Sequence, residues 1–228
     1  MHRLLKPVFV LALGLAATLA QAGALDAIST GDASAGVKEA LSKGADYTVA
    51  SLGKSGGFLG NDKVKIPLPG YLQKADSALR MFGMGKQADQ LVETMNHAAE
   101  NAVAVAKPVL VESIKKMSVQ DAKGILTGGD DSVTQYFKRT STDQLAAKFM
   151  PIVKAETSKL QLADQYNKFA GKAASAGLIE QKDADIDGYV THKAMDGLFL
   201  MIAEEERKLR ANPVGAGSDL LKKVFGAL

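Results

Sequence analysis

The sequence predicts an all-α fold, built as a single irregular helical bundle. Apolar residues recur at the helical period of about 3.6 residues through most of the chain. Tryptophan is absent and aromatic residues make up only 6% of the chain, so the core must consist mainly of alanine, leucine, valine, isoleucine and methionine. The alternation typical of a strand is confined to residues 63–68. Helices therefore account for the expected architecture.

Residues 23–69 are predicted to form an N-terminal helical arm and a linker. The helix begins near Ser34 and ends at Gly53, and a glycine-rich loop follows it. Lys63–Ile66 alternates like a short strand. The next segment, Ile66-Pro67-Leu68-Pro69, must be extended, because each proline moves the residue before it out of the helical region. This Pro-Leu-Pro segment is expected to join the arm to the main body.

Residues 70–213 form the predicted main bundle, and residues 214–228 a flexible hinge with an amphipathic tail. Pro108 kinks or splits the longest periodic stretch, and Pro151 interrupts another. Ser118 and Asp121 resemble a capping box at the start of a short helix. The expected helical ranges are Tyr71–Phe82, Gln87–Met117, Ser118–Leu126, Ser132–Thr140, Thr142–Lys172 and Asp185–Ala211.

The first 22 residues have the pattern of a cleaved secretory signal. Arg3 and Lys6 precede an uncharged apolar run, and Ala20-Gln21-Ala22 provides the small-x-small site for cleavage after Ala22. The apolar run is too short for a stable membrane span, and no later run is long enough, so no transmembrane segment is expected after cleavage. We therefore expect a periplasmic or secreted protein.

Composition excludes several classes of function. The chain has no cysteine, so it has no disulfide, no thiolate metal site and no cysteine nucleophile. Without Arg3 and Lys6, the basic residues nearly balance the 25 acidic ones and are scattered among them. A nucleic-acid binder normally has a clustered basic face, so nucleic acid is not an expected partner.

The sharpest candidate for a metal site is the acidic stretch that begins at Asp183. Asp183, Asp185 and Asp187 stand at the first, third and fifth positions of a calcium-binding loop, with Gly188 at the sixth. Ala194 occupies the twelfth position, where such a loop needs a bidentate glutamate. The alternative is that these acids cap the start of a helix and favour its positive end. Both interpretations remain open from the sequence.

The candidate for catalysis is a histidine between two acids. Glu93, His97 and Glu100 share one face of a helix, and two carboxylates beside an imidazole can orient it as a general base or bind a metal. The apolar stripe runs along the other side of this helix, so we expect the three residues to face water as an ordinary charged surface. Asn96 is expected to be buried and hydrogen-bonded.

Two features near the C-terminus predict a charged helix surface and a segment that can dock. Glu204 and Lys208, and likewise Glu206 and Arg210, are spaced as helical ion pairs, which predicts a solvated face on the last helix. Leu220–Leu228 is a short, basic, amphipathic segment beyond a flexible hinge. It either folds back onto the bundle or docks on a partner or a membrane surface.

Several short motifs, taken in their order and spacing, resemble a known family. The chain is similar to the bacterial domain-of-unknown-function family 4197, exported proteins of Gram-negative bacteria, from about Leu25 to Phe225. The resemblance implies a helical exported domain and brings no activity or cofactor with it. The family more often has arginine where this chain has His97, which argues against a catalytic role for that residue. The motifs are Gly36–Leu41, Ile66–Pro69, Met95–Glu100, Asp121–Leu126 with Gly128, Tyr136–Lys138, Tyr189–Thr191, Asp196–Phe199, Glu204–Arg207, Arg210–Pro213 and Leu221–Phe225.

Taken together, these observations predict an exported, non-catalytic helical protein that acts as a binding or scaffold module and needs no cofactor. An apolar groove for a hydrophobic small molecule or a protein partner is the expected site. The first alternative is a calcium-binding protein that uses the acidic loop 183–191. The second is an enzyme that acts through His97 with Glu93 or Glu100, which requires those side chains to converge in a cleft.

Overall fold

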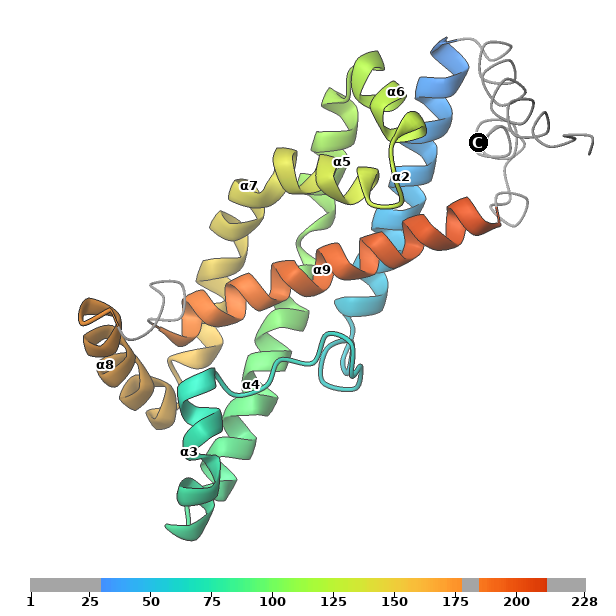
Figure 1. The fold of residues 1–228 in the computed structure, drawn as a ribbon. Coiled ribbons are helices and arrows are strands. Elements are labelled where there is room, and N and C mark those ends of the chain that lie inside the picture. Colours follow the sequence, from blue (N-terminus) through green and yellow to red (C-terminus); the bar gives the residue numbers. More distant parts are fainter. Residues whose placement is uncertain (1–29, 178–184, 213–228) are drawn as a thin grey trace, which may run out of the picture.

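The computed structural model describes residues 30–177 and 185–212, and every regular element within these two ranges is a helix. The prediction of an all-α fold is therefore confirmed (Figure 1). The helices are α2 (Thr30–Leu52), α3 (Gly70–Met81), α4 (Gly85–Ala104), α5 (Lys107–Lys116), α6 (Val119–Thr127), α7 (Ser132–Thr157), α8 (Gln161–Ser175) and α9 (Ile186–Ala211).

The long helices α4, α7 and α9 pack against one another at the centre of the bundle. α2 crosses the C-terminal half of α9 and packs against α5 and α6, whereas α3 and α8 lie at the opposite end of the molecule (Figure 1). The predicted apolar stripes meet in this core, because helical periodicity places them on the facing sides. The fully buried core side chains include Leu91, Met95, Leu145, Phe149 and Leu198.

α7 differs from the sequence prediction. It runs without a break through Ser141 and Pro151, where the sequence predicts two helices and an interruption. A proline removes one backbone hydrogen bond from a helix, but packing can hold the flanking turns in line. Phe149 and Val153, on either side of Pro151, are both completely buried. The predicted stretch Thr142–Lys172 is instead divided after Thr157, where α7 ends.

Two other local predictions are confirmed. Pro108 is the second residue of α5, and the periodic stretch is split just before it, between α4 and α5. Val105, the C-cap residue of α4 at this split, is 38% exposed. Ser118 caps α6 in a complete capping box: its hydroxyl accepts the Asp121 N–H at 3.0 Å, and the Asp121 carboxylate accepts the Ser118 N–H at 3.1 Å.

The loop between α2 and α3 contains no strand, so the prediction of a short strand at residues 63–66 is wrong. The Val64 and Lys65 N–H groups both donate to the Asn61 carbonyl, which makes this stretch a turn. Residues 66–69 lie outside any helix or turn, and Pro69 is extended, with φ −55° and ψ 149°, which agrees with the prediction for this segment. Alternation over only four residues is a weak indication of a strand, and the hydrogen bonds of the turn determine the conformation here.

Two buried side chains of α4 hold this loop in place. The Asn96 amide bonds to both backbone groups of Ile66: Oδ1 accepts the N–H at 2.8 Å, and Nδ2 donates to the carbonyl at 2.9 Å. One turn further along α4, the Glu100 carboxylate accepts the N–H groups of Phe58 and Leu59 at 3.0 and 3.1 Å. The expectation that Asn96 is buried and hydrogen-bonded is confirmed.

Candidate binding groove

A groove of about 630 Å³ lies where α2 crosses α9 and the first turns of α7. Its lining is predominantly apolar, and the apolar residues come from all three helices. Those nearest the interior, such as Leu41, Phe137 and Ile202, also belong to the hydrophobic core. The apolar lining consists of Ala40, Leu41, Gly44, Ala45, Tyr47, Val133, Phe137, Ile202, Leu209 and Ala211.

The groove exists because α2 presents small residues where it passes over α9. Ala40 and Gly44 are one turn apart and therefore share one face of α2. A Cβ atom added at Gly44 would meet no atom within 4 Å, so the space above this residue is open. On α9, Ile202 and Leu209 lie two turns apart on the facing side. Larger residues at the α2 positions would fill this space.

The rim of the groove carries one aromatic ring and a few charged side chains. Tyr47 is 55% exposed, and the Lys208 ammonium lies 5.8 Å from the centre of its ring. Lys208 also donates a hydrogen bond of 2.6 Å to Glu205. This bond raises the pKa of Lys208, so the ammonium group stays charged at neutral pH. The groove therefore combines an apolar floor with a charged edge.

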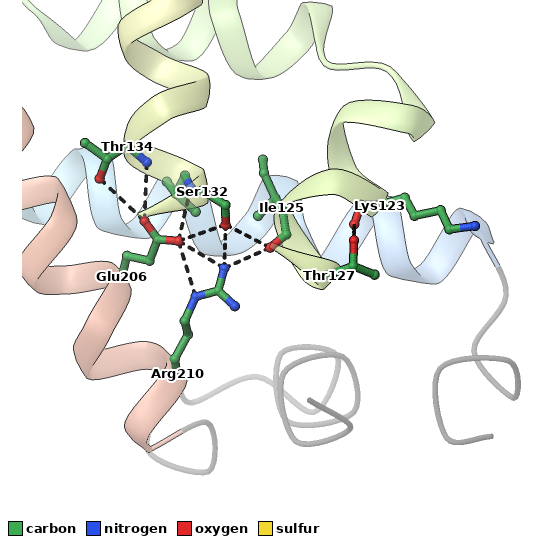
Figure 2. Close-up of polar contacts among 8 residues, drawn as sticks. Lys123, Ile125, Thr127, Ser132, Thr134, Glu206 and Arg210 are labelled. Carbon is green, nitrogen blue, oxygen red and sulfur yellow. Dashed lines mark hydrogen bonds and ion pairs between the residues drawn. The ribbon is translucent and has the colours of Figure 1, made fainter. Parts of the chain in front are cut away.

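One wall of the groove includes the buried Glu206, whose ion pair with Arg210 joins three helices (Figure 2). The Glu206 carboxylate accepts the backbone N–H groups of Val133 and Thr134, at 3.0 and 3.3 Å, and hydroxyl bonds from Ser132 and Thr134. These N–H groups belong to the first turn of α7, where they have no partner within the helix. Glu206 therefore caps α7 and places a negative charge at its positive end.

Arg210 performs the complementary task at α6. Its guanidinium donates to the Ile125 carbonyl at 2.8 Å, in the last turn of α6, and to the Ser132 hydroxyl at 2.7 Å (Figure 2). Carbonyl groups at this end of a helix lack partners within the helix and carry partial negative charge. Arg210 also pairs with Glu206 at 3.0 Å. The pair on α9 thus fixes the turn between α6 and α7.

The prediction of a solvated face at the end of α9 is wrong for this pair. The Glu206 residue is only 4% exposed, because the α6–α7 turn covers it. The ion pair predicted between Glu204 and Lys208 is also replaced: Lys208 binds Glu205, and Glu204 binds Lys63 of the loop before α3 at 2.7 Å. Spacing along one helix does not show which other elements pack over it.

The three residues proposed for catalysis do meet, although not as expected. His97 Nδ1 lies 2.8 Å from Glu100 Oε2, and Nε2 lies 3.7 Å from Glu93 Oε1. The His97 and Glu93 side chains face water, as predicted, but Glu100 is 3% exposed because the loop around Phe58 covers it. Glu100 thereby holds that loop. The trio lines neither the groove nor a second cavity of about 510 Å³ between α6 and α7.

The acidic stretch is only partly within the described residues. Asp185 is the N-cap of α9 and accepts the Gly188 N–H at 2.6 Å, as the capping interpretation predicts. The Asp187 carboxylate accepts a hydrogen bond from the Thr157 hydroxyl. Asp183 lies outside the described residues, as do the signal segment and the amphipathic tail. Calcium binding at this stretch stays a prediction.

No helix of residues 30–177 and 185–212 combines the length and the hydropathy that a membrane span needs. In the same part of the chain, no group of three histidine, aspartate or glutamate side chains is placed to hold a metal ion. The α2–α7–α9 groove has the features of a binding site, because it is concave, mainly apolar and edged by charge. Sequence periodicity did not identify it, because it depends on where two helices cross.

Comparison with known proteins identifies a family but no characterised relative. No curated protein and no solved structure matches the chain. The model of the family described as "Protein of unknown function (DUF4197)" matches residues 27–226, a range that includes the groove and most of the amphipathic tail. The match confirms the resemblance found in the sequence motifs. Because it covers most of the chain, the protein belongs to the DUF4197 family.

Proposed function

We propose that this protein is an exported, non-catalytic binding module that holds an apolar small molecule, of the kind that contains an acyl chain, in the α2–α7–α9 groove. The observation that carries this proposal is the groove itself, whose volume of about 630 Å³ matches that of typical small-molecule sites. Export to the periplasm or to the outside is part of the proposal, and it rests on the signal pattern of residues 1–22.

The lining supports an apolar ligand rather than a polar one. Hydrophobic side chains from three helices form the floor, and polar groups are restricted to the rim and one wall. Glu206, the charged group of that wall, already binds Arg210 and the first turn of α7, and Arg210 binds the last turn of α6. They are therefore committed to the fold. Affinity for a ligand must come from burial of apolar surface, which contributes about 25 cal/mol per Å².

The test uses two probes, the dye 1-anilinonaphthalene-8-sulfonate and oleate. Gly44→Leu puts a larger side chain into the open space of the groove, and a Cβ atom at this position meets no neighbouring atom within 4 Å. Gly171→Leu is the matched control, because Gly171 also lies in a helix with open space around it but is outside the groove. We expect the wild type to enhance dye fluorescence and oleate to displace the dye.

In the same titrations, Gly44→Leu should weaken dye binding at least tenfold, and Gly171→Leu should leave it unchanged. Native mass spectrometry of the oleate complex should give one bound molecule per chain. Equal binding by both variants would place the dye elsewhere and contradict the proposal. So would a wild type that binds neither probe.

A further inference from the structure

We infer that the chain's own C-terminal segment, Leu220–Leu228, occupies the α2–α7–α9 groove when no ligand is bound and competes with the ligand for it. The statement that the segment competes with a ligand rests on the proposed function. The statement that the segment occupies the groove rests on the shape of the groove and on the position of α9. The groove would then bind a segment of the same chain.

The end of α9 delivers the chain to the groove. Ala211, the last residue of α9, and Asn212, its C-cap, both line the groove. The backbone at Asn212 has left the helical conformation, with φ −142° and ψ 72°, and Pro213 prevents continuation of the helix. The described chain therefore leaves α9 at residues that line the groove.

The composition of the segment suits an apolar groove. Leu220, Leu221, Val224 and Phe225 fall at helical spacings of one and four residues, which would place them together on one side. Lys222 and Lys223 fall on the other side, where water can solvate them. An amphipathic segment bound by its apolar face is a common mode of peptide recognition. A helix this short is marginal alone in water, so a groove supplies the burial that it needs.

The connection between α9 and the segment has the right length. The part of α9 that borders the groove, from Ile202 to Ala211, spans about 14 Å. The linker of residues 213–219 contains two glycines, and a flexible linker of this length bridges on average about 15 Å. Tethering over such a distance gives an effective concentration in the millimolar range, so even weak contacts fill the groove.

The first experiment traps the segment in the groove by a disulfide. The natural chain has no cysteine, so two introduced cysteines can pair only with each other. Gly44→Cys with Val224→Cys tests the inference in the full chain, because the space above Gly44 is open. Gly171→Cys with Val224→Cys is the matched control, since Gly171 has equal space but lies on α8.

With both proteins oxidised at low micromolar concentration, we expect an intrachain disulfide in the first pair and little in the second. The product is read on a non-reducing gel and by mass spectrometry of the linked peptides. Oleate should slow the reaction of the first pair. Equal yields from the two pairs, or no disulfide in either, would overturn the inference.

The second experiment separates this inference from the proposed function. Leu221→Asp with Val224→Asp weakens the apolar face of the segment, and Val214→Asp with Ser218→Asp adds the same charge to the linker. We expect the first double variant to bind the dye several-fold more tightly than the wild type and the second to match the wild type.

A disulfide at Gly44→Cys without dye binding by any variant would refute the proposed function alone. Dye binding in the groove that is unaffected by the segment variants would refute the inference alone.

Discussion

Glu206 and Arg210, one turn apart on α9, cap the ends of two different helices. The carboxylate accepts N–H groups from the first turn of α7, and the guanidinium donates to a carbonyl in the last turn of α6. Each charge lies at the helix end of opposite partial charge. The two side chains therefore bind backbone groups at both helix ends. They also form an ion pair with each other, and Arg210 binds the Ser132 hydroxyl.

Removal of this carboxylate should be the most destabilising charge change in the described chain. Glu206→Ala leaves the Arg210 charge partly buried and the α7 N–H groups unpaired, which should cost about 3–5 kcal/mol of unfolding free energy. Urea unfolding at neutral pH measures the loss. Glu112→Ala is the control, because Glu112 forms an exposed ion pair with Lys116 and should cost less than about 1 kcal/mol. Equal losses in the two variants would contradict the capping role.

Asn96 should be nearly as sensitive, although it is uncharged. Asn96→Ala leaves both backbone groups of Ile66 without their partner, and each buried unpaired group costs roughly 1–3 kcal/mol, so we expect a loss of about 2–4 kcal/mol. Asn101→Ala, an exposed position on the same helix, should change stability by less than about 0.5 kcal/mol. Denaturant unfolding of both variants decides this. A small effect at Asn96 would mean that the loop is held by other contacts.

Two glycine substitutions should act in opposite directions. A Cβ added at Gly197 in α9 would lie 2.7 Å from the ring of buried Phe58, so Gly197→Ala should destabilise the protein by about 1–3 kcal/mol through overpacking. Gly171→Ala in α8 meets open space and should stabilise the protein by up to about 1 kcal/mol through helix propensity. Thermal unfolding compares the two. If Gly197→Ala also stabilised the protein, the Phe58 ring would move aside freely and the predicted overpacking would be refuted.

Glu100 should make the unfolding free energy depend on pH in the acidic range. Burial acts to raise the pKa of Glu100, but hydrogen bonds from Phe58, His97 and Leu59 together outweigh burial and lower it. A carboxyl group whose pKa is lower in the folded state stabilises the fold above its unfolded-state pKa, about 4.3. That contribution is lost as pH falls through the lower, folded-state pKa.

The variant that tests this effect is Glu100→Gln. The amide can still accept the two backbone bonds and donate to His97, but it does not titrate. Between about pH 5 and pH 3, the unfolding free energy should fall less steeply in the variant than in the wild type. Glu93→Gln removes an exposed carboxylate beside the same histidine and controls for the change in charge. Parallel curves for the wild type and Glu100→Gln would refute the effect.

Asp185 allows capping and calcium binding to be separated. Asp185→Ala removes the N-cap of α9 and should lower stability by about 1 kcal/mol in the presence of a chelator. If the acidic stretch binds calcium, millimolar calcium should raise the Tm of the wild type, and Asp185→Ala should abolish the rise. Thermal unfolding with and without calcium measures both effects. An unchanged wild-type Tm would leave capping as the sole role of Asp185.

Much of the fold was predictable because helix signals are local. Periodicity located most helices, the Ser118–Asp121 capping box was evident from two residues, and Pro108 marked the split before α5. The continuity of α7 through Pro151 was not predictable, because the buried neighbours that hold it belong to the tertiary structure.

The site was less predictable for the same reason. Glu100 and Glu206 occupy positions that helical spacing assigns to a wet surface, and both are buried by segments distant in sequence: the loop at Phe58 and the turn before α7. An acidic residue followed at four residues by arginine has the same pattern whether it is exposed or capping another helix. The groove likewise depends on a crossing of α2 and α9 that no local pattern encodes.

The hydrogen bonds between Asn96 and Ile66 also protect the protein against aggregation. An extended segment with free backbone groups invites another chain to add to it as a strand. Ile66 offers neither its N–H nor the accompanying carbonyl, because the amide of Asn96 takes both. Pro67 and Pro69 have no N–H to offer. Within residues 66–69, the Leu68 N–H is therefore the one donor left for an incoming strand while α4 stays in place.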